Sequence, residues 1–254
     1  MTDKHQMASI LHEAYRANDV FPDSCHGVLS IEEAYQVQFE LAELREADGD
    51  SIAGWKVGLT AEAMQIQRGM NEPCLGHLLQ SGQVLSPAIF QFDELISPGF
   101  ENELCFRLKA PLSGTNVSFE EAATAIGEVA PALEIIERRS GFSNDFPLAM
   151  AGNAQQKSFV TGAFISLSQG FDLSQVTATI SVNGEVQETA TGDKVLGNPI
   201  NSLIWLAAKL AEYGRVIDAG AVVMSGSFTK QYSIAKGDIV HTQFEGIGVV
   251  EARF

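Results

Sequence analysis

Basic residues are scarce in this sequence. It has 16 Lys and Arg against 32 Asp and Glu over 254 residues, which gives a formal net charge of -16 at pH 7. Nucleic acids and anionic membrane surfaces are bound through clustered Lys and Arg, which neutralise their phosphates. The deficit therefore argues against both kinds of partner, and a small anionic ligand would need a metal ion or a well-placed cation to offset the charge of the protein.

Cysteines and long apolar runs are scarce too. The three cysteines, Cys25, Cys74 and Cys105, are odd in number and lack metal-ligand spacing, so they predict reduced thiols and no disulfide framework. No apolar run approaches the length of a membrane span, and the first residues lack an apolar signal core. We therefore expect a soluble, cytoplasmic protein without a membrane partner.

Several catalytic signatures are missing as well. The sequence has no Gly-x-Ser-x-Gly elbow, no Walker loop, no dinucleotide-binding fingerprint and no His-Glu-x-x-His pair. His77 and His241 stand alone in the sequence, which favours a structural role for each of them. The acidic residues remain as the main candidates for chemistry.

The local sequence signals change from helix to strand about one fifth of the way along the chain. Before that point, apolar residues recur at helical spacing over 3–18, and the capping box that begins at Ser30 predicts a second helix. After it, short extended segments alternate with Gly and Pro, and few helices are expected. The prediction is an α+β fold with a curled mixed β-sheet domain over 51–254 and a helical N-terminal segment over 1–50 packed on it.

Local signals predict several strands. Extended segments are expected over 101–108, 131–137 and 158–166. Between two further extended segments, Asn183 and Gly184 both tolerate positive φ, which predicts a type I′ hairpin turn at this point.

Helix starts are predicted from side chains that can accept a hydrogen bond from a free backbone N–H group. Ser118 begins a second capping box, which predicts a short helix after it. Thr60 and Asn201 are expected to be the N-caps of two more helices.

Three glutamates have a placement that indicates a divalent-cation site. Glu101 and Glu103 fall on the same face of their predicted strand, since strand side chains alternate. Glu134 lies inside an apolar run, where an ionised carboxylate is costly to bury without a cation or strong donors. Oxygen ligands without nearby His or Cys favour Mg²⁺ or Mn²⁺ over zinc. Spacing alone also allows two glutamates on a solvated strand face and a Glu134 paired with Arg138 or Arg139.

Two other segments are open to a functional and an ordinary interpretation. Lys56 is a lone cation among apolar residues, so it either faces a substrate or extends to the surface. Residues 225–229 follow an apolar strand with small hydroxyl residues and a glycine, which suits either a carboxylate-binding loop or an ordinary loop.

Seven short motifs follow one another along the chain, and their order is far more specific than any single motif. They cover residues 54–60, 72–79, 101–103, 131–135, 153–154, 205–210 and 226–229. In this order they resemble the 2-oxopent-4-enoate hydratase and 4-oxalocrotonate decarboxylase group of the fumarylacetoacetate hydrolase superfamily. The resemblance covers nearly the whole chain, including the opening pair of helices.

The resemblance implies a curled mixed β-sheet, a bound Mg²⁺ or Mn²⁺ and a homo-oligomer. Carried over by motif, Glu101, Glu103 and Glu134 look like the metal ligands. The fold agrees with what the residues suggest by themselves, and the resemblance decides in favour of the metal site where spacing alone left the alternative open.

The resemblance also implies a small anionic 2-oxo acid as substrate. Lys56 looks like the cation on the substrate side, and it would act in catalysis as well as in binding. By the same comparison Asn153, Ser227 and Thr229 look like substrate-binding residues.

The chain departs from the pattern of the resembled group at two motifs. Hydratases of that group usually carry an Asp, proposed as an acid or base, where this chain has Cys74. They also tend to have an Asp and a small residue around the Asn-Ala pair, where this chain has Gly152 and Gln155. The metal ligands are retained while the proton-transfer position, Cys74, is altered.

The predicted function is a divalent-metal-dependent lyase acting on a chelated 2-oxo or 2-hydroxy-dienoic acid. The first candidate is 2-keto-4-pentenoate (2-hydroxypenta-2,4-dienoate) hydratase, an activity of aromatic-compound catabolism. A 4-oxalocrotonate-type decarboxylase is the next alternative. An acylpyruvate C–C hydrolase would need a His–Glu base that the sequence does not offer, and a non-catalytic oxo-acid-binding homologue is the last alternative.

Overall fold

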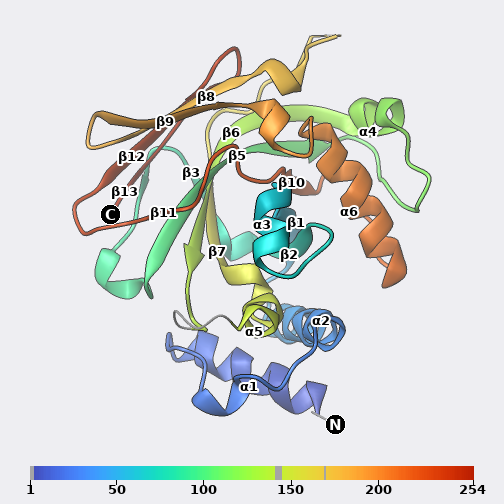
Figure 1. Cartoon of the computed structure of the whole chain (residues 1–254), viewed down its shortest axis with the longest axis vertical. Helices are drawn as coiled ribbons and strands as arrows, with labels where there is room; N and C mark the ends of the chain where they lie inside the picture. The colour runs from blue at the N-terminus through green and yellow to red at the C-terminus, as the bar shows by residue number, and fades with distance from the viewer. Residues whose placement is uncertain (1–2, 141–144, 169) are drawn as a thin grey trace.

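A computed structural model describes residues 3–140, 145–168 and 170–254, and it contains two β-sheets (Figure 1). The larger sheet has the order β2-β1-β10-β5-β6-β7-β3, with β11 paired to β5. Its strands are β1 (Ile52–Gly58), β2 (Cys74–Leu79), β3 (Gln83–Leu85), β5 (Pro98–Leu108), β6 (Ile126–Glu137), β7 (Gln156–Thr161), β10 (Val222–Met224) and β11 (Tyr232–Ser233).

The smaller sheet has the order β4-β13-β12-β8-β9. Its strands are β4 (Ala88–Ile89), β8 (Thr177–Val182), β9 (Glu185–Thr191), β12 (Ile239–Phe244) and β13 (Gly248–Arg253). The β1–β10, β3–β7 and β4–β13 pairs are parallel, and the remaining pairs are antiparallel. The predicted α+β class with a curled mixed sheet is therefore confirmed.

Helices cover one end and one side of the sheets (Figure 1). They are α1 (Lys4–Arg16), α2 (Ile31–Ala47), α3 (Glu62–Gln67), α4 (Phe119–Ala125), α5 (Phe146–Ala151) and α6 (Ile200–Glu212). In the described part of the chain, none of them is long and apolar enough to cross a membrane.

The N-terminal helices pack on the sheet domain through α5 and β2. The amide of Gln38 in α2 is fully buried and donates hydrogen bonds to the carbonyl oxygens of Leu75, at 3.1 Å, and Met150, at 2.7 Å. A buried amide with two backbone partners fixes α2 relative to both elements. The division at residue 50 stays a prediction.

Most local signals agree with the structure. Both capping boxes are present, at Ser30 and Ser118, and each begins the helix that it predicts. Asn183 and Gly184 both have positive φ in the turn between β8 and β9, so the hairpin prediction is confirmed. The predicted strand over 158–166 ends earlier, at Thr161.

Two predicted N-caps are wrong, and in both cases the side chain has another role. Helix α3 begins after Ala61, because the buried side chain of Thr60 packs against Gly226. Helix α6 begins after Pro199, and the Asn201 side chain donates to the carbonyl oxygen of Leu196 at 2.8 Å.

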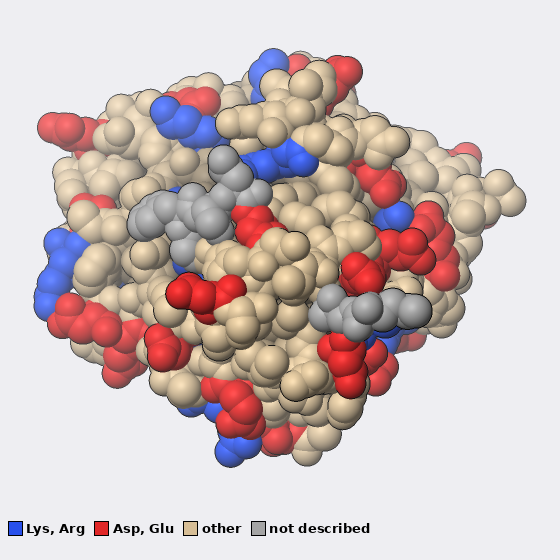
Figure 2. Space-filling model, turned by 60° about the horizontal axis from the view of Figure 1, so that its bottom comes forward, with Lys and Arg blue, Asp and Glu red and all other residues tan. Residues whose placement is uncertain are grey.

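The distribution of charge on the surface agrees with the shortage of basic residues. On the face shown in Figure 2, Lys and Arg side chains form small separate groups among more numerous Asp and Glu. Extended phosphate backbones require continuous basic surfaces. This face therefore lacks the character of a nucleic-acid-binding surface.

Candidate metal centre

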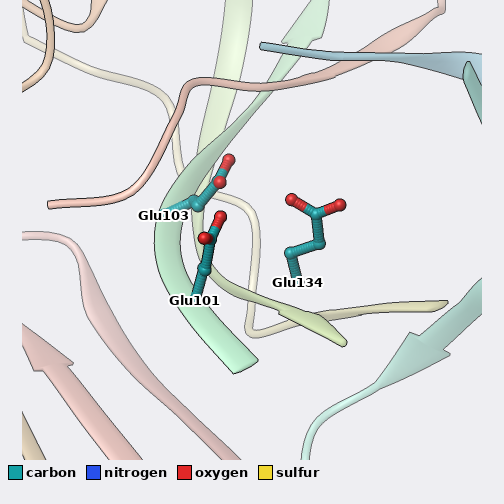
Figure 3. Close-up of side chains that lie close together, drawn as sticks. All are labelled: Glu101, Glu103 and Glu134. Carbon is teal, nitrogen blue, oxygen red and sulfur yellow. The ribbon is translucent and has the colours of Figure 1, made fainter. Parts of the chain in front are cut away.

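The three glutamates come together where β5 and β6 pair. Glu101 on β5 lies directly opposite Glu134 on β6, and Glu103 follows two residues along on the same face. Their ligand atoms all lie within 4.8 Å of one another (Figure 3). Directly opposed residues of an antiparallel pair share a face, so the register of these two strands creates the cluster.

Burial sets this cluster apart from an ordinary acidic patch. Glu103 and Glu134 are fully buried and Glu101 is partly buried. Within the described part of the chain, Glu134 Oε2 and Glu103 Oε1 have no hydrogen-bond partner, and the one neighbour of Glu134 Oε1 is the ammonium group of Lys56 at 3.2 Å. Buried polar atoms are normally satisfied, so these oxygens lack a ligand. An all-oxygen set of this kind fits a hard divalent cation such as Mg²⁺.

The pKa values of these carboxyls reflect their crowding. Burial raises the pKa of Glu134 to about 7; Lys56 opposes the rise and Glu101 adds to it. Burial also raises the pKa of Glu103 well above its usual range, with further contributions from the other two glutamates. A divalent cation would reverse both effects because it neutralises the charge that burial penalises.

The structure excludes the two ordinary interpretations, in which Glu134 pairs with Arg138 or Arg139 and Lys56 extends to the surface. Arg139 pairs with Glu137 at 2.6 Å, and Arg138 donates to Gln231 at 2.8 Å. The partner of Glu134 is Lys56, whose Nζ lies 3.2 Å from Glu134 Oε1. Lys56 is 4% exposed, so it does not extend to the surface.

Lys56 is held as a buried cation beside the carboxylates. Burial alone lowers the pKa of Lys56, but Glu134 and the neighbouring acidic groups outweigh it, so the pKa lies above the ordinary value. Nζ of Lys56 also donates to the carbonyl oxygen of Ala154 at 3.0 Å. Lys56 therefore provides a fixed positive charge next to the candidate metal position.

A glycine in the loop after β10 completes the surroundings of Glu103. The N–H of Gly226 donates to Glu103 Oε2 at 2.8 Å. Gly226 has a φ of +103°, and a Cβ at this position would lie 2.4 Å from Thr60 Cγ2. Only glycine fits both the backbone conformation and the close contact with Thr60.

A cavity of about 310 Å³ lies beside the cluster. Lys56, Glu101, Ser227 and Thr229 line it, and Cys74 does too. The hydroxyl of Thr229 donates to Asn102 Oδ1 at 2.7 Å, which orients it at the rim of the cavity. The structure thus brings most of the predicted site residues together around one space.

Cys74 lies in this cavity as a neutral thiol. Burial raises the pKa of Cys74 to about 11, and the nearby Lys56 only partly offsets the effect. All three cysteines are free, as the sequence predicts, and the structure buries all of them. A thiol with this pKa stays protonated at neutral pH, whereas an Asp carboxyl is ordinarily ionised there.

Asn153 is placed differently from the other predicted site residues. Its buried amide bonds to the main chain of His77, and its neighbours Ala154 and Gln155, but not Asn153, line the cavity. His77 itself is buried away from the glutamates, and burial lowers its pKa to about 3. A neutral, buried histidine agrees with the structural role expected for His77.

Four residues at the cavity were missed by sequence reasoning. Gln231 donates to Glu101 Oε1 at 3.2 Å, and Arg138 holds Gln231 in turn. Arg68 and Lys230 add two exposed cations to the lining. Lys230 and Gln231 directly follow a predicted motif, and the sequence suggests Arg138 only as an ion-pair partner of Glu134, whereas nothing in the sequence relates Arg68 to the glutamates.

Known proteins are similar to this chain in sequence and in fold. The family model described as fumarylacetoacetate (FAA) hydrolase C-terminal matches residues 80–254. The 2-oxo-hept-4-ene-1,7-dioate hydratase of Escherichia coli is 34% identical, over 89% of this chain and 87% of that protein. The 2-keto-4-pentenoate hydratase of Paraburkholderia xenovorans is 30% identical, over 93% of this chain and 86% of that protein.

A solved structure extends the likeness to the whole chain. It is the 4-oxalocrotonate decarboxylase of Pseudomonas putida G7, complexed with magnesium and adipate. The TM-score is 0.91 at 33% sequence identity, and the match covers 100% of this chain and 99% of that protein. The family resemblance expected from the seven motifs is thereby confirmed, and this chain belongs to the fumarylacetoacetate (FAA) hydrolase C-terminal family.

Proposed function

We propose that the protein is a divalent-metal-dependent lyase that acts on a small 2-oxo acid. The observation that carries this proposal is the convergence of Glu101, Glu103 and Glu134 beside the buried cation Lys56, with Glu103 Oε1 and Glu134 Oε2 left without a partner among the described residues. The relatives of this protein are named hydratases and decarboxylases, which are lyases. In the related decarboxylase, one structure holds magnesium and adipate, and another holds calcium and acetate.

Glu101, Glu103 and Glu134 would hold the ion, and Mg²⁺ or Mn²⁺ suits their oxygen donors. Such an ion, when bound, supplies electrostatic stabilisation to the negative charge that reaches the 2-oxo oxygen during enolisation. Lys56 contributes a second positive charge at the cavity wall, which lowers the cost of bringing a dianion into an acidic protein. Ser227 provides a hydroxyl donor for the substrate carboxylate, and Thr229 provides a second one when its O–H turns from Asn102 Oδ1 toward the substrate.

Two lyase reactions fit this arrangement and differ in their need for proton transfer. Hydration of 2-hydroxypenta-2,4-dienoate requires a group that delivers a proton to carbon and activates water. Decarboxylation of 4-oxalocrotonate requires mainly that the electron pair of the broken C–C bond passes to the 2-oxo oxygen as CO₂ leaves. Cys74 is a neutral thiol at the position where an acid or base is usual. This observation supports decarboxylation as a second candidate beside hydration.

Two exposed cations at the cavity favour a substrate with a second carboxylate. Arg68 and Lys230 are both lining residues, and in the described part of the chain neither forms an ion pair. Lys230 instead lies over the Tyr232 ring, with Nζ 5.2 Å from its centroid. Dicarboxylic 2-oxo acids such as 4-oxalocrotonate are therefore the preferred substrate class.

One experiment separates the candidate reactions. The Mg²⁺-loaded protein is incubated with 2-hydroxypenta-2,4-dienoate, 4-oxalocrotonate and an acylpyruvate, while ultraviolet absorbance and CO₂ are followed. Release of CO₂ identifies the decarboxylase, and loss of the dienoate absorbance identifies the hydratase. Turnover of the acylpyruvate alone would contradict the lyase proposal, and no turnover of any acid would leave an oxo-acid-binding protein.

A matched pair of variants tests the metal ligands. Glu134→Gln should weaken Mg²⁺ binding about 100-fold or more and abolish turnover, because it removes a charged ligand from a buried set. Glu128→Gln on the same strand is the control, since Glu128 pairs with Arg107 away from the cavity. Isothermal titration measures both affinities, and equal affinities would contradict the proposed ligand set.

We also retain a homo-oligomer as a proposal. It rests on the family resemblance, and light scattering at several protein concentrations tests it.

A further inference from the structure

We propose that Gly76 and Asn153 are positioning residues that fix the buried Lys56 cation at the cavity wall. This inference rests on the proposed function, in which Lys56 faces the 2-oxo acid. Neither residue lines the cavity beside the three glutamates, so neither is expected to contact the substrate directly.

The first observation is a narrow passage for the Lys56 side chain. Lys56 on β1 lies directly opposite Gly76 on β2. A Cβ built at Gly76 would lie 3.0 Å from Lys56 Cε and 3.0 Å from Asn153 Oδ1, closer than nearly all real contacts of a Cβ. The missing side chain at Gly76 therefore leaves the space through which Lys56 passes between β2 and the turn at Asn153.

The second observation is an unusual backbone turn. Asn153, Ala154 and Gln155 have φ values of 62°, 49° and 68°, so three consecutive residues with side chains adopt the left-handed region. Each such residue is disfavoured unless its surroundings hold it in place. This turn therefore needs an anchor.

The Asn153 side chain provides that anchor. Its Oδ1 accepts a hydrogen bond from the N–H of His77 at 2.7 Å, and its Nδ2 donates to the carbonyl oxygen of His77 at 2.9 Å. Asn153 is 3% exposed, so water does not compete with these bonds. The two bonds fasten the turn to β2 directly beside Gly76.

The anchored turn positions a hydrogen-bond acceptor for the ammonium group of Lys56. The carbonyl oxygen of Ala154 accepts from Lys56 Nζ at 3.0 Å, in addition to the ion pair of Nζ with Glu134. With both partners, Nζ is fixed between the turn and the carboxylates. Without the Ala154 carbonyl, Nζ would be drawn toward the glutamates, where it would compete with the metal ion and face the cavity less.

A double-mutant cycle tests whether Asn153 acts through Lys56. The probe is oxalate, a planar dianion that chelates metal ions, and its dissociation constant is measured at saturating Mg²⁺. We expect Lys56→Ala to weaken oxalate binding about 10- to 100-fold and Asn153→Ala about 5-fold or more, which is the range for lost charged hydrogen bonds. The double variant should match Lys56→Ala within about twofold, because residues that act in series are not additive.

Additive losses in the double variant would overturn the inference, since a merely structural Asn153 would weaken binding whether or not Lys56 is present. A wild-type affinity retained by Asn153→Ala would overturn it as well. If Lys56→Ala binds oxalate normally, the proposed role of Lys56 fails and the positioning inference fails with it.

Crystal structures of two glycine variants give a readout that does not depend on any ligand. Gly76→Ala should move Nζ of Lys56 by more than about 1 Å from the Ala154 carbonyl, by the volume of one methyl group. Gly127→Ala is the matched control: its Cβ would lie 3.2 Å from the Lys109 side chain, far from Lys56 in the sheet. An unmoved Nζ in Gly76→Ala would overturn the inference even if no 2-oxo acid is turned over.

Discussion

Nζ of Lys56 lies 3.2 Å from Oε1 of Glu134, and both side chains are almost completely buried. Buried ion pairs are strongly destabilising when one partner is removed. Here the pair also joins two parts of the site, because Glu134 belongs to the metal cluster and Lys56 lines the substrate cavity. The following predictions start from this relationship.

Removal of Lys56 should lower the free energy of unfolding of the metal-free protein and leave that of the metal-loaded protein nearly unchanged. Lys56→Met leaves Glu134 without its cation, and we expect a loss of about 3 kcal/mol in the free energy of unfolding at pH 8. Saturating Mg²⁺ should restore most of it, since the ion replaces the lost charge. Urea denaturation with and without Mg²⁺ measures both values. Lys209→Met is the control, because Lys209 pairs with Glu72 and Glu212 outside the cluster.

The cations at the cavity should select for a second carboxylate. A protein with both Arg68→Gln and Lys230→Gln should show a KM for 4-oxalocrotonate raised about 5- to 10-fold, and a KM for a monocarboxylic 2-oxo acid within about twofold of the wild type. Because both cations are exposed, the wild-type preference should shrink at high salt. Equal changes in both KM values would contradict a role in recognising the second carboxylate.

The glycine beside Glu103 should not tolerate a side chain. Gly226→Ala combines a φ of +103° with a Cβ 2.4 Å from Thr60 Cγ2, and we expect it to destabilise the fold by about 3 kcal/mol and to weaken metal binding. Gly197→Ala separates the two causes, because Gly197 has a φ of +78° with nothing within 4 Å. It should cost about 1 kcal/mol and leave metal binding unchanged. Thermal unfolding and metal titration compare the two variants.

Acid should weaken the fold in part through His77. Burial lowers the pKa of His77 from 6.5 to about 3, so the unfolded chain binds its proton at a higher pH than the folded protein does. The stability that depends on neutral His77 is present above pH 6.5 and is lost as the pH falls toward 3. Between pH 7 and pH 4 the loss is about 3 kcal/mol.

A variant pair checks this assignment. His77→Gln should unfold with a shallower dependence on pH across this window, whereas His5→Gln, which changes an exposed histidine, should not. Urea denaturation at several pH values measures the slopes. Identical slopes in wild type and His77→Gln would show that other groups cause the acid sensitivity.

Much of this protein follows from local sequence rules. The capping boxes at Ser30 and Ser118 begin helices where the rules place them, since a cap depends on residues three positions apart. Strand alternation puts Glu101 and Glu103 on one face, and the apolar neighbours of Glu134 are enough to mark its carboxylate as costly to bury. The order of the seven motifs indicates the family.

Tertiary structure decided which groups meet. As an alternative to a bound cation, the sequence offered Arg138 or Arg139 as partners of Glu134. The pairing of β1 with β2 and the left-handed turn at Ala154 bring Lys56 to it instead. Thr60 looks like a helix cap and is a packing partner of Gly226, because close contact between distant loops overrides local preference. Local rules depend on neighbours within a few residues, whereas the cation, the carboxylates and the cavity come from strands far apart in the chain, and only their register fixes the distances on which the chemistry depends.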